Sequence, residues 1–295
     1  MQELRGKLIA DRIKGECLDF VGKYNGIMPA LAILRVGNKE ADLSYERSIK
    51  KRFVDFGLEA KDYELPENCT NEEFQEVFDF INNDPEIHGI LVMRPLPKQI
   101  DEGEMLKKMN PLKDIDCITD ANVSGVMRGD KDAFAPCTAQ AVVEILKGYN
   151  IEMAGKKACI IGRSMVVGKP LSMLLLKENA TVTVCHSKTE NIKAVASDAD
   201  IVIAAIGKAK QISSGYIKED ATLIDVGINV DEQGNLCGDC DWDQIVLKAG
   251  AATPVPGGVG TVTTAVLAKH LIDAARRQMN LPEVDDTRDE YVSES

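Results

Sequence analysis

The chain has 295 residues, 44% of them hydrophobic and 28% charged, a profile typical of a soluble globular protein with material for about two domains. The formal net charge of −12 argues against a general affinity for nucleic acid or for an anionic membrane surface, because the long-range field has the wrong sign. No apolar stretch reaches the roughly 18 residues of a membrane span, and the start has no apolar core preceded by positive charge, so we expect a cytoplasmic protein.

Eight cysteines are scattered through the chain, and two of them, Cys159 and Cys185, lie inside apparent strands. This distribution favours small buried side chains in a reducing compartment over a disulfide framework. Cys237 and Cys240 have the spacing of metal ligands, but no second Cys or His pair lies nearby, which makes them a poor zinc site. We therefore predict no bound metal.

The first half of the chain alternates helix and strand patterns. Apolar spacing, turn residues and a capping box at Thr70 predict, in order, a helix over 4–24, a strand over 30–36, a helix over 43–56, a strand near Tyr63, a helix from 70 to 82 and a strand over 89–93. On the second helix Tyr45, Ile49, Phe53 and Phe56 fall on one face, which must point toward a core or a cleft. A short helix then precedes Asp116, and a connecting helix starts at 136–138.

The second half is organised around residues 157–170, which read as a buried strand, a phosphate-binding turn and a helix start. Gly162 permits the tight turn, and Gly168 permits the following helix to pack closely while its first amide groups face a phosphate. The turn departs from the usual Gly-x-Gly-x-x-Gly fingerprint. Strand patterns over 180–184, 198–206 and 222–226 continue the unit as a parallel sheet.

The turn after the second strand of this unit bears on the choice of dinucleotide. NAD-selective sites carry an acidic residue there, but this chain has His186, Ser187 and Lys188. Arg163 by charge and Ser187 by hydrogen bonding suit the extra phosphate of NADP, with Lys188 as an alternative to Ser187. We predict NADP, with NAD as the alternative; the competing interpretation is that Arg163 is a solvated loop residue.

A glycine-rich loop over 253–261 precedes the last predicted helix, 262–279. Its prolines make one end rigid, and its glycines let the backbone approach a ligand closely. The tail from 282 to 295 is acidic and poor in large apolar residues, so we expect it to be disordered.

Several motifs in this order and spacing resemble the methylenetetrahydrofolate dehydrogenase and methenyltetrahydrofolate cyclohydrolase enzymes of one-carbon metabolism. The resemblance spans nearly the whole chain. It rests on Val36-Gly-Asn38, Tyr45, Gly89-Ile-Leu-Val92 with Pro95-Leu-Pro97, Lys113-Asp-Ile-Asp116, Pro136-Cys-Thr138, Gly162-Arg-Ser164 with Gly168, Asp225-Val-Gly-Ile-Asn229 and Pro254-Val-Pro-Gly-Gly-Val-Gly260.

The resemblance implies an α/β chain of two domains, the second a Rossmann-like parallel-sheet domain that binds the dinucleotide. It implies a folate-binding catalytic domain made of residues 1–136 and 262–295, with the last helix returning to it, and an NAD(P)-binding domain over 137–261. It also implies a homodimer, a folate substrate held between the domains, and NADP more often than NAD.

Site residues follow from the same resemblance. Tyr45 would stack against the folate and Asp116 would hydrogen-bond its pterin ring, which makes these two the candidate catalytic residues; the alternatives are a core aromatic and a solvated loop carboxylate. The substrate residues would further include Pro256, Gly257 and Gly258. The cofactor residues would be Gly162, Arg163, Ser164, Gly168, Ser187 and Ile228.

The chain departs from the family pattern at the residues that serve hydrolysis. Ile49 stands where the pattern has the lysine of the cyclohydrolase step, and Met93 stands where it has the glutamine that hydrogen-bonds that lysine. Cys117 replaces a glycine, and Thr261 with Val262 replaces a proline and a methionine. These changes point to an altered folate pocket.

We therefore expect an oxidoreductase that converts 5,10-methylenetetrahydrofolate to 5,10-methenyltetrahydrofolate, with cyclohydrolase activity weak or lost. Lys50 should point away from the face shared by Tyr45 and Ile49, and Arg94 stays protonated and makes a poor base. The alternatives are a bifunctional enzyme with a substitute base, a catalytically silent folate or nucleotide sensor, and a dehydrogenase of another small metabolite.

Overall fold

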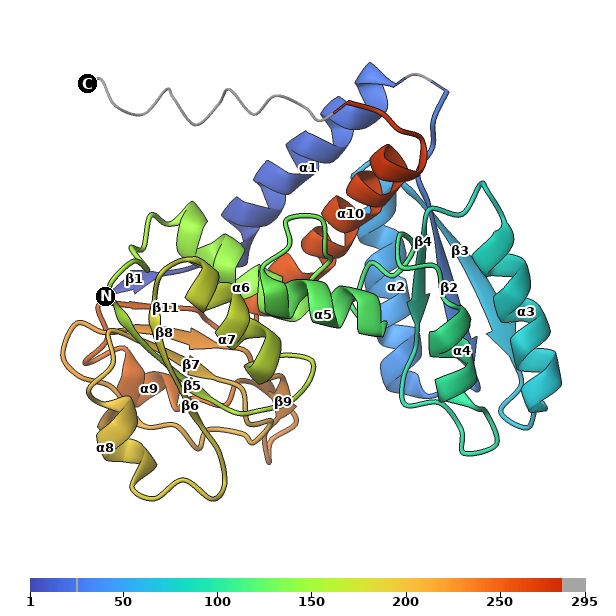
Figure 1. Ribbon diagram of the computed structural model, residues 1–295. Helices are drawn as coiled ribbons and strands as arrows, with labels where there is room; N and C mark the ends of the chain where they lie inside the picture. Colours follow the sequence, from blue (N-terminus) through green and yellow to red (C-terminus); the bar gives the residue numbers. More distant parts are fainter. Residues whose placement is uncertain (25, 283–295) are drawn as a thin grey trace.

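The computed structural model describes residues 1–24 and 26–282, which form two α/β domains (Figure 1). The amino-terminal domain contains a three-stranded parallel sheet in the order β3-β2-β4, with β2 at Ala30–Val36, β3 at Glu59–Leu65 and β4 at Gly89–Val92. All seven residues of β2 are buried, as expected for a central parallel strand covered on both faces. The predicted strands of this half are confirmed.

The helices of this half are α1 (Gly6–Lys23), α2 (Glu40–Asp55), α3 (Asn71–Asn83), α4 (Glu102–Lys108) and α5 (Asp120–Arg128). The predicted capping box of α3 is present, since the Thr70 hydroxyl accepts from the Glu73 backbone and the Glu73 carboxylate accepts from the Thr70 backbone. Helix α5 was not predicted, although the Thr119 cap before it and the left-handed Gly129 after it are helix signals.

The second domain is built on a six-stranded sheet in the order β1-β11-β8-β7-β5-β6, in which every pair is parallel. The four predicted strands are β5 (Lys157–Ile161), β6 (Thr181–Cys185), β7 (Ile201–Ala204) and β8 (Thr222–Asp225). Two short strands that were not predicted extend it, β11 (Ala251–Ala252) and β1 (Gln2–Glu3). The very start of the chain therefore lies in the second sheet rather than with the first domain.

The remaining elements around this sheet are α6 (Cys137–Gly148), α7 (Gly168–Lys177), α8 (Ile192–Ala196), the short 3-10 turn η1 (Ser214–Tyr216), β9 (Asn229–Val230), β10 (Leu236–Cys237) and α9 (Trp242–Ile245). Strands β9 and β10 pair antiparallel as a separate small ribbon.

The last helix, α10 (Val259–Gln278), joins the two halves of the molecule. It contacts α1, α2 and β4 of the amino-terminal half and also α6, and Figure 1 shows it lying beside α1. One apolar cluster runs through this junction, from Leu31 of β2 and Ile49 of α2 to Ile160 of β5 and Val262 of α10. The two domains thus share a continuous core.

All eight cysteines are buried and free, which agrees with the prediction of small buried side chains. Among the described helices, none combines the length and the apolar character needed to cross a bilayer. The predicted disordered tail falls almost wholly in residues 283–295, outside the described part of the chain.

Candidate functional site

Tyr45, Asp116 and Cys137 come together although they belong to three separate segments. Tyr45 lies on the inner face of α2 and packs against the core that joins the domains. Asp116 lies before α5, and its Oδ1 accepts the backbone N–H of Cys137, the first residue of α6, at 3.1 Å. The positive end of α6 thus faces this carboxylate, which still has lone pairs for a donor group on a ligand.

The chemistry of this group is set mainly by burial. Burial raises the pKa of the Tyr45 hydroxyl, and the negative charge of Asp116 raises it further, so Tyr45 stays protonated at neutral pH. Burial also raises the pKa of Asp116, opposed by the Cys137 hydrogen bond and by the positive charge of Arg94. The pair combines an aromatic ring that carries a donor with a carboxyl acceptor, which suits the edge and face of a heteroaromatic ligand.

His270 contacts the segment that carries Asp116. It lies on α10, and its Nδ1 is 2.9 Å from the carbonyl oxygen of Ile115. Burial lowers the pKa of His270, so the ring is neutral and Nδ1 carries the donated proton. No role for His270 is predictable from the sequence, because a lone histidine in an amphipathic helix pattern gives no signal.

Ile49 lies one helical turn after Tyr45 on α2, and Met93 directly follows β4; both are apolar and belong to the core that Tyr45 packs against. Ile49 is 0% exposed and Met93 is 7% exposed, and both belong to the same core cluster as Ile115 and Cys137. Neither side chain can activate water or transfer a proton. These two positions are therefore buried and chemically inert.

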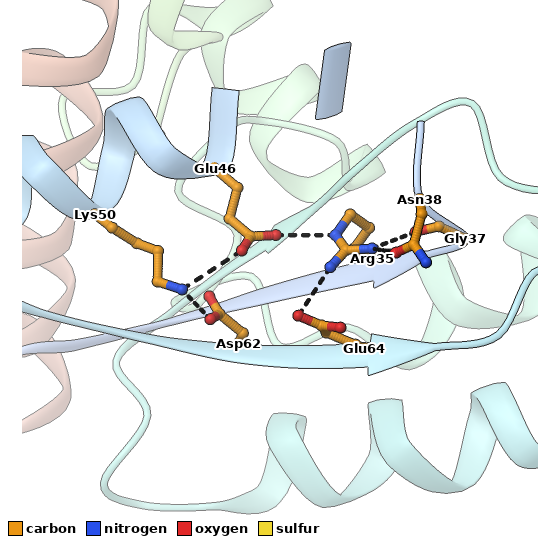
Figure 2. A network of polar contacts seen from close by, with 7 residues as sticks. All are labelled: Arg35, Gly37, Asn38, Glu46, Lys50, Asp62 and Glu64. Atoms are coloured by element: carbon orange, nitrogen blue, oxygen red, sulfur yellow. Dashed lines mark hydrogen bonds and ion pairs between the residues drawn. The ribbon is translucent and has the colours of Figure 1, made fainter. Parts of the chain in front are cut away.

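Lys50 and Arg94 are both engaged elsewhere. Figure 2 shows the Lys50 ammonium directed at Asp62 of β3, and it also lies 3.5 Å from Glu46. Arg94 is paired with Glu102 at 2.5 Å. The predicted direction of Lys50, away from the face of Tyr45, is confirmed.

Cys117 explains one departure from the family pattern in part. Its φ is +58°, a left-handed conformation that glycine adopts with least strain. The thiol packs with Val126 and Ala135 in a small apolar cluster.

The dinucleotide turn has the geometry predicted for it. Gly162 has φ +136°, and a Cβ there would collide with the carbonyl oxygen of Ala205. A Cβ on Gly168 would likewise collide with the carbonyl of Gly162. Ser164 closes the turn, since its hydroxyl accepts the Val167 backbone N–H at 3.1 Å. Only glycine at these two positions lets the turn fold back on the sheet.

Arg163 and Ser187 lie just beyond the carboxyl ends of the neighbouring strands β5 and β6. Ile161 pairs with Cys185, so Arg163 and Ser187 each follow their strand by two residues, and both are exposed. Among residues 1–24 and 26–282, Arg163 forms no ion pair. Ligands of parallel sheets bind at the carboxyl ends of the strands, where these two residues lie.

The glycine-rich loop leads into α10. Pro256 and Gly257 are exposed, whereas Gly258 is buried at the cap of α10. Ile228, which follows β8 and is 66% exposed, lies against the start of α10. A Cβ added to Gly260 would be 3.3 Å from the Cδ1 of Ile228. The structure gives no direct contact from this loop to Tyr45 or Asp116; α10 is the element that links them.

Two buried aspartates, Asp225 and Asp239, organise the loops at this edge. Asp225 accepts the backbone N–H groups of Gly227, Asp239 and Cys240. A Cβ on Gly238 would overlap the Asp225 carboxylate, so the glycine of the Cys237–Cys240 segment serves this contact. The spacing that resembled metal ligands therefore has a structural origin. The one sequence signal for this contact is the aspartate that follows Gly238.

A parallel sheet with a phosphate turn at its carboxyl edge, joined to a second α/β domain through one long helix, defines a two-domain protein of the dinucleotide-binding class. Residues 4–116 match the catalytic domain of tetrahydrofolate dehydrogenase/cyclohydrolase, and residues 136–279 match the NAD(P)-binding domain of the same enzymes. The chain belongs to the tetrahydrofolate dehydrogenase/cyclohydrolase family.

Individual relatives agree over almost the full length. The chain is 50% identical over 281 residues to the bifunctional protein FolD of Clostridioides difficile, covering 95% of this chain and 98% of that protein. It resembles the crystal structure of the bifunctional enzyme FolD from Campylobacter jejuni with a TM-score of 0.90 and 37% identity, over 94% and 99% of the two chains. For the Trypanosoma brucei enzyme, described as complexed with NADP cofactor and inhibitor, the TM-score is 0.85 with 34% identity, over 93% and 95%.

Proposed function

We propose that this protein oxidises 5,10-methylenetetrahydrofolate to 5,10-methenyltetrahydrofolate with NADP and has lost most or all of the cyclohydrolase activity. The observation that carries the proposal is that Ile49, one helical turn after Tyr45, and Met93, directly after β4, are apolar and buried in the core. The relatives named above are called bifunctional, so the proposal sets this chain apart from them.

The dehydrogenase step tolerates apolar side chains at positions 49 and 93. The folate nitrogens supply the electrons that expel hydride, so no protein acid or base is needed. The protein has to hold the donor carbon and the nicotinamide at attack distance and exclude competing reactions. Tyr45 and Asp116, which would hold the folate, are both present and adjacent.

Hydrolysis of the methenyl bridge makes a different demand. A water must be activated and a proton moved, and a positioned acid-base group contributes about a hundred- to ten-thousand-fold to such a step. Lys50 does not replace the missing lysine, because its hydrogen bond to Asp62 raises its pKa and keeps it charged and turned away. Arg94 is paired with Glu102, and a guanidinium makes a poor general base.

The choice of NADP rests on Arg163 and Ser187, which leave the sheet edge together with no carboxylate between β6 and Lys188. The Trypanosoma brucei relative described with NADP supports the same choice. We include a homodimer in the proposal because the family resemblance implies one; a sedimentation mass equal to one chain would contradict it.

Two absorbance assays test the proposal. With methylenetetrahydrofolate and NADP, reduced cofactor should form in proportion to enzyme. With methenyltetrahydrofolate alone, the decay should match the buffer blank. Enzyme-dependent decay well above the blank would overturn the loss of hydrolysis, and binding without turnover in the first assay would identify a sensor instead.

A further inference from the structure

Asp239, in the segment between β10 and α9, is 0% exposed and its carboxylate accepts four N–H groups. Oδ2 accepts the backbone N–H groups of Ile206 at 2.6 Å and Gly207 at 3.1 Å. Oδ1 accepts the backbone N–H of Lys208 at 2.8 Å and the Asn229 side-chain amide at 2.9 Å. Three consecutive backbone amides thus converge on one buried charge, which fixes the conformation of residues 206–208.

Residues 206–208 lie where a cofactor must pass. They follow β7 at the carboxyl edge of the sheet, next to the turn that follows β5. The carbonyl of Ala205 lies so close to Gly162 that no Cβ fits between them. The backbone that Asp239 holds is therefore continuous with the surface against which the dinucleotide turn rests.

Asp239 is itself held in place from the next strands. Its backbone N–H is bound by Asp225 of β8 at 3.0 Å, and the Asp225 backbone N–H is bound by the hydroxyl of Thr253 at 2.8 Å. Thr253 opens the glycine-rich loop. A chain of buried hydrogen bonds thus runs from that loop through Asp225 and Asp239 to the loop after β7.

We infer that Asp239 is a positioning residue of the dinucleotide site, acting through the backbone of residues 206–208 without touching the cofactor. The inference rests on the proposed dehydrogenase function, and it adds a residue that neither the family motifs used above nor the predicted site contained. It requires that loss of the charge weaken dinucleotide binding while the folate side is spared.

The test is Asp239→Asn, which keeps the shape but places an NH₂ group against backbone donors. Hydrogen bonds to a charged group contribute enough that we expect the Kd for NADP, titrated without folate, to rise about tenfold or more. The KM for methylenetetrahydrofolate and the kcat at saturating cofactor should stay within about twofold of the parent values. Asn229→Ala, which removes one of the four donors, should raise the same Kd by a smaller factor.

Asp114→Asn is the matched control. Asp114 is also 0% exposed, and it accepts from the backbone of Ile118, from Thr119 and from Asn122, but it lies two residues from Asp116. It should raise the folate KM and leave the NADP Kd unchanged. The inference would be overturned if Asp239→Asn left the NADP Kd unchanged, or if it raised the NADP Kd and the folate KM by the same factor.

If Asp239→Asn does not fold, Asn229→Ala decides by the same criterion. The NADP titration needs no turnover. If the parent enzyme is inactive but binds NADP, the proposed reaction is refuted, and the role of Asp239 is still tested by comparing the NADP Kd of Asp239→Asn with that of the parent. A parent enzyme that binds neither NADP nor NAD refutes both.

Discussion

At the scale of single residues, the proposed loss of cyclohydrolase activity depends on positions 49 and 93. Restoring the pair, with Ile49→Lys and Met93→Gln together, should produce hydrolysis of methenyltetrahydrofolate. A lysine at a fully buried position has a lowered pKa, which supplies the unprotonated amine that Lys50 cannot supply. We expect the rate above the blank to rise about tenfold or more, below the full hundredfold of an evolved acid-base group.

The matched control is Ile49→Met with Met93→Gln. In this double variant the side chain at position 49 has a length similar to that of lysine but carries no amine. It should stay at the blank, and both double variants should keep the dehydrogenase rate close to that of the parent. Equal hydrolysis in the two double variants would show that the amine is not the group that matters.

We predict that the selectivity for NADP over NAD depends on Arg163. Arg163→Ala removes a charge-assisted contact of roughly 1.5 to 3 kcal/mol, so kcat/KM for NADP should fall about tenfold or more while that for NAD changes little. Lys177→Ala, at the far end of α7, is the control and should change neither value. Equal specificity constants for NADP and NAD in the parent enzyme would contradict the assignment at once.

The turn formed by Gly162 and Gly168 was predictable because local backbone geometry requires glycine there, whereas Tyr45 and Asp116 were named through the family resemblance. Asp239 and His270 were not predictable, because their roles come from partners far along the chain. His270 lies 155 residues from the Ile115 carbonyl it contacts, and no pattern in a single sequence shows that pairing.

At the scale of elements, the ion-pair network of Figure 2 sets the position of α2. Arg35 of β2 is 2% exposed, and its guanidinium lies 2.9 Å from Glu46 of α2 and 2.9 Å from Glu64 of β3. It also donates to the carbonyl of Gly37 and to Asn38 at the loop before α2. Glu46 adjoins Tyr45 in sequence, so the network fixes the rotation of the helix that carries the candidate folate residue.

Arg35→Met should therefore destabilise the fold. Removing one partner leaves the Glu46 charge buried without its main counter-charge, a change that costs about 3 kcal/mol in comparable buried pairs. The free energy of unfolding from urea titration measures the loss. Arg35→Met with Glu46→Gln should recover part of it, since no unpaired charge remains; a double variant as unstable as the single one would show that packing, and not charge, is the cause.

Long, strongly apolar strands and amphipathic helices were predicted with boundaries close to those observed. Burial of one or both faces of such an element requires apolar residues at regular spacing, and this spacing is visible in the sequence. The strands β1 and β11 were missed because each has two residues, and Gln2 and Glu3 are polar. Their pairing depends on a contact between Gln2 and Ala251, at opposite ends of the chain.

At the scale of the whole molecule, two buried histidines link the stability of the fold to pH. Burial lowers the pKa of His88, as do the charges of Lys113 and Lys61, against the opposing influence of Asp84 and Glu86. Its Nδ1 accepts the backbone N–H of Ala30 at 3.2 Å, which only the unprotonated nitrogen can do. Burial likewise lowers the pKa of His270.

Both rings stay neutral in the folded protein while the unfolded chain takes up protons near the ordinary histidine pKa of about 6.5. Below that pH the unfolded state binds more protons, so the free energy of unfolding should fall as the pH falls from about 6.5 toward 5. Each histidine contributes at most about 1.4 kcal/mol per pH unit in this window. The raised pKa values of Asp116 and Asp225 act in the opposite direction, because there the folded state holds the proton more readily.

His88→Gln separates the histidine contribution from that of the aspartates, since it removes the titrating ring and keeps a side-chain acceptor near the Ala30 N–H. Urea titrations of both proteins at pH 8, 6.5, 5.8 and 5 give the slope of stability against pH. The difference in the free energy of unfolding at pH 8 measures the cost of the substitution itself. Below about pH 6.5 the free energy of unfolding of the variant should fall less steeply with pH than that of the parent. Parallel curves throughout would mean that His88 is protonated in the folded state as readily as in the unfolded one, contrary to the burial of its ring beside Lys113.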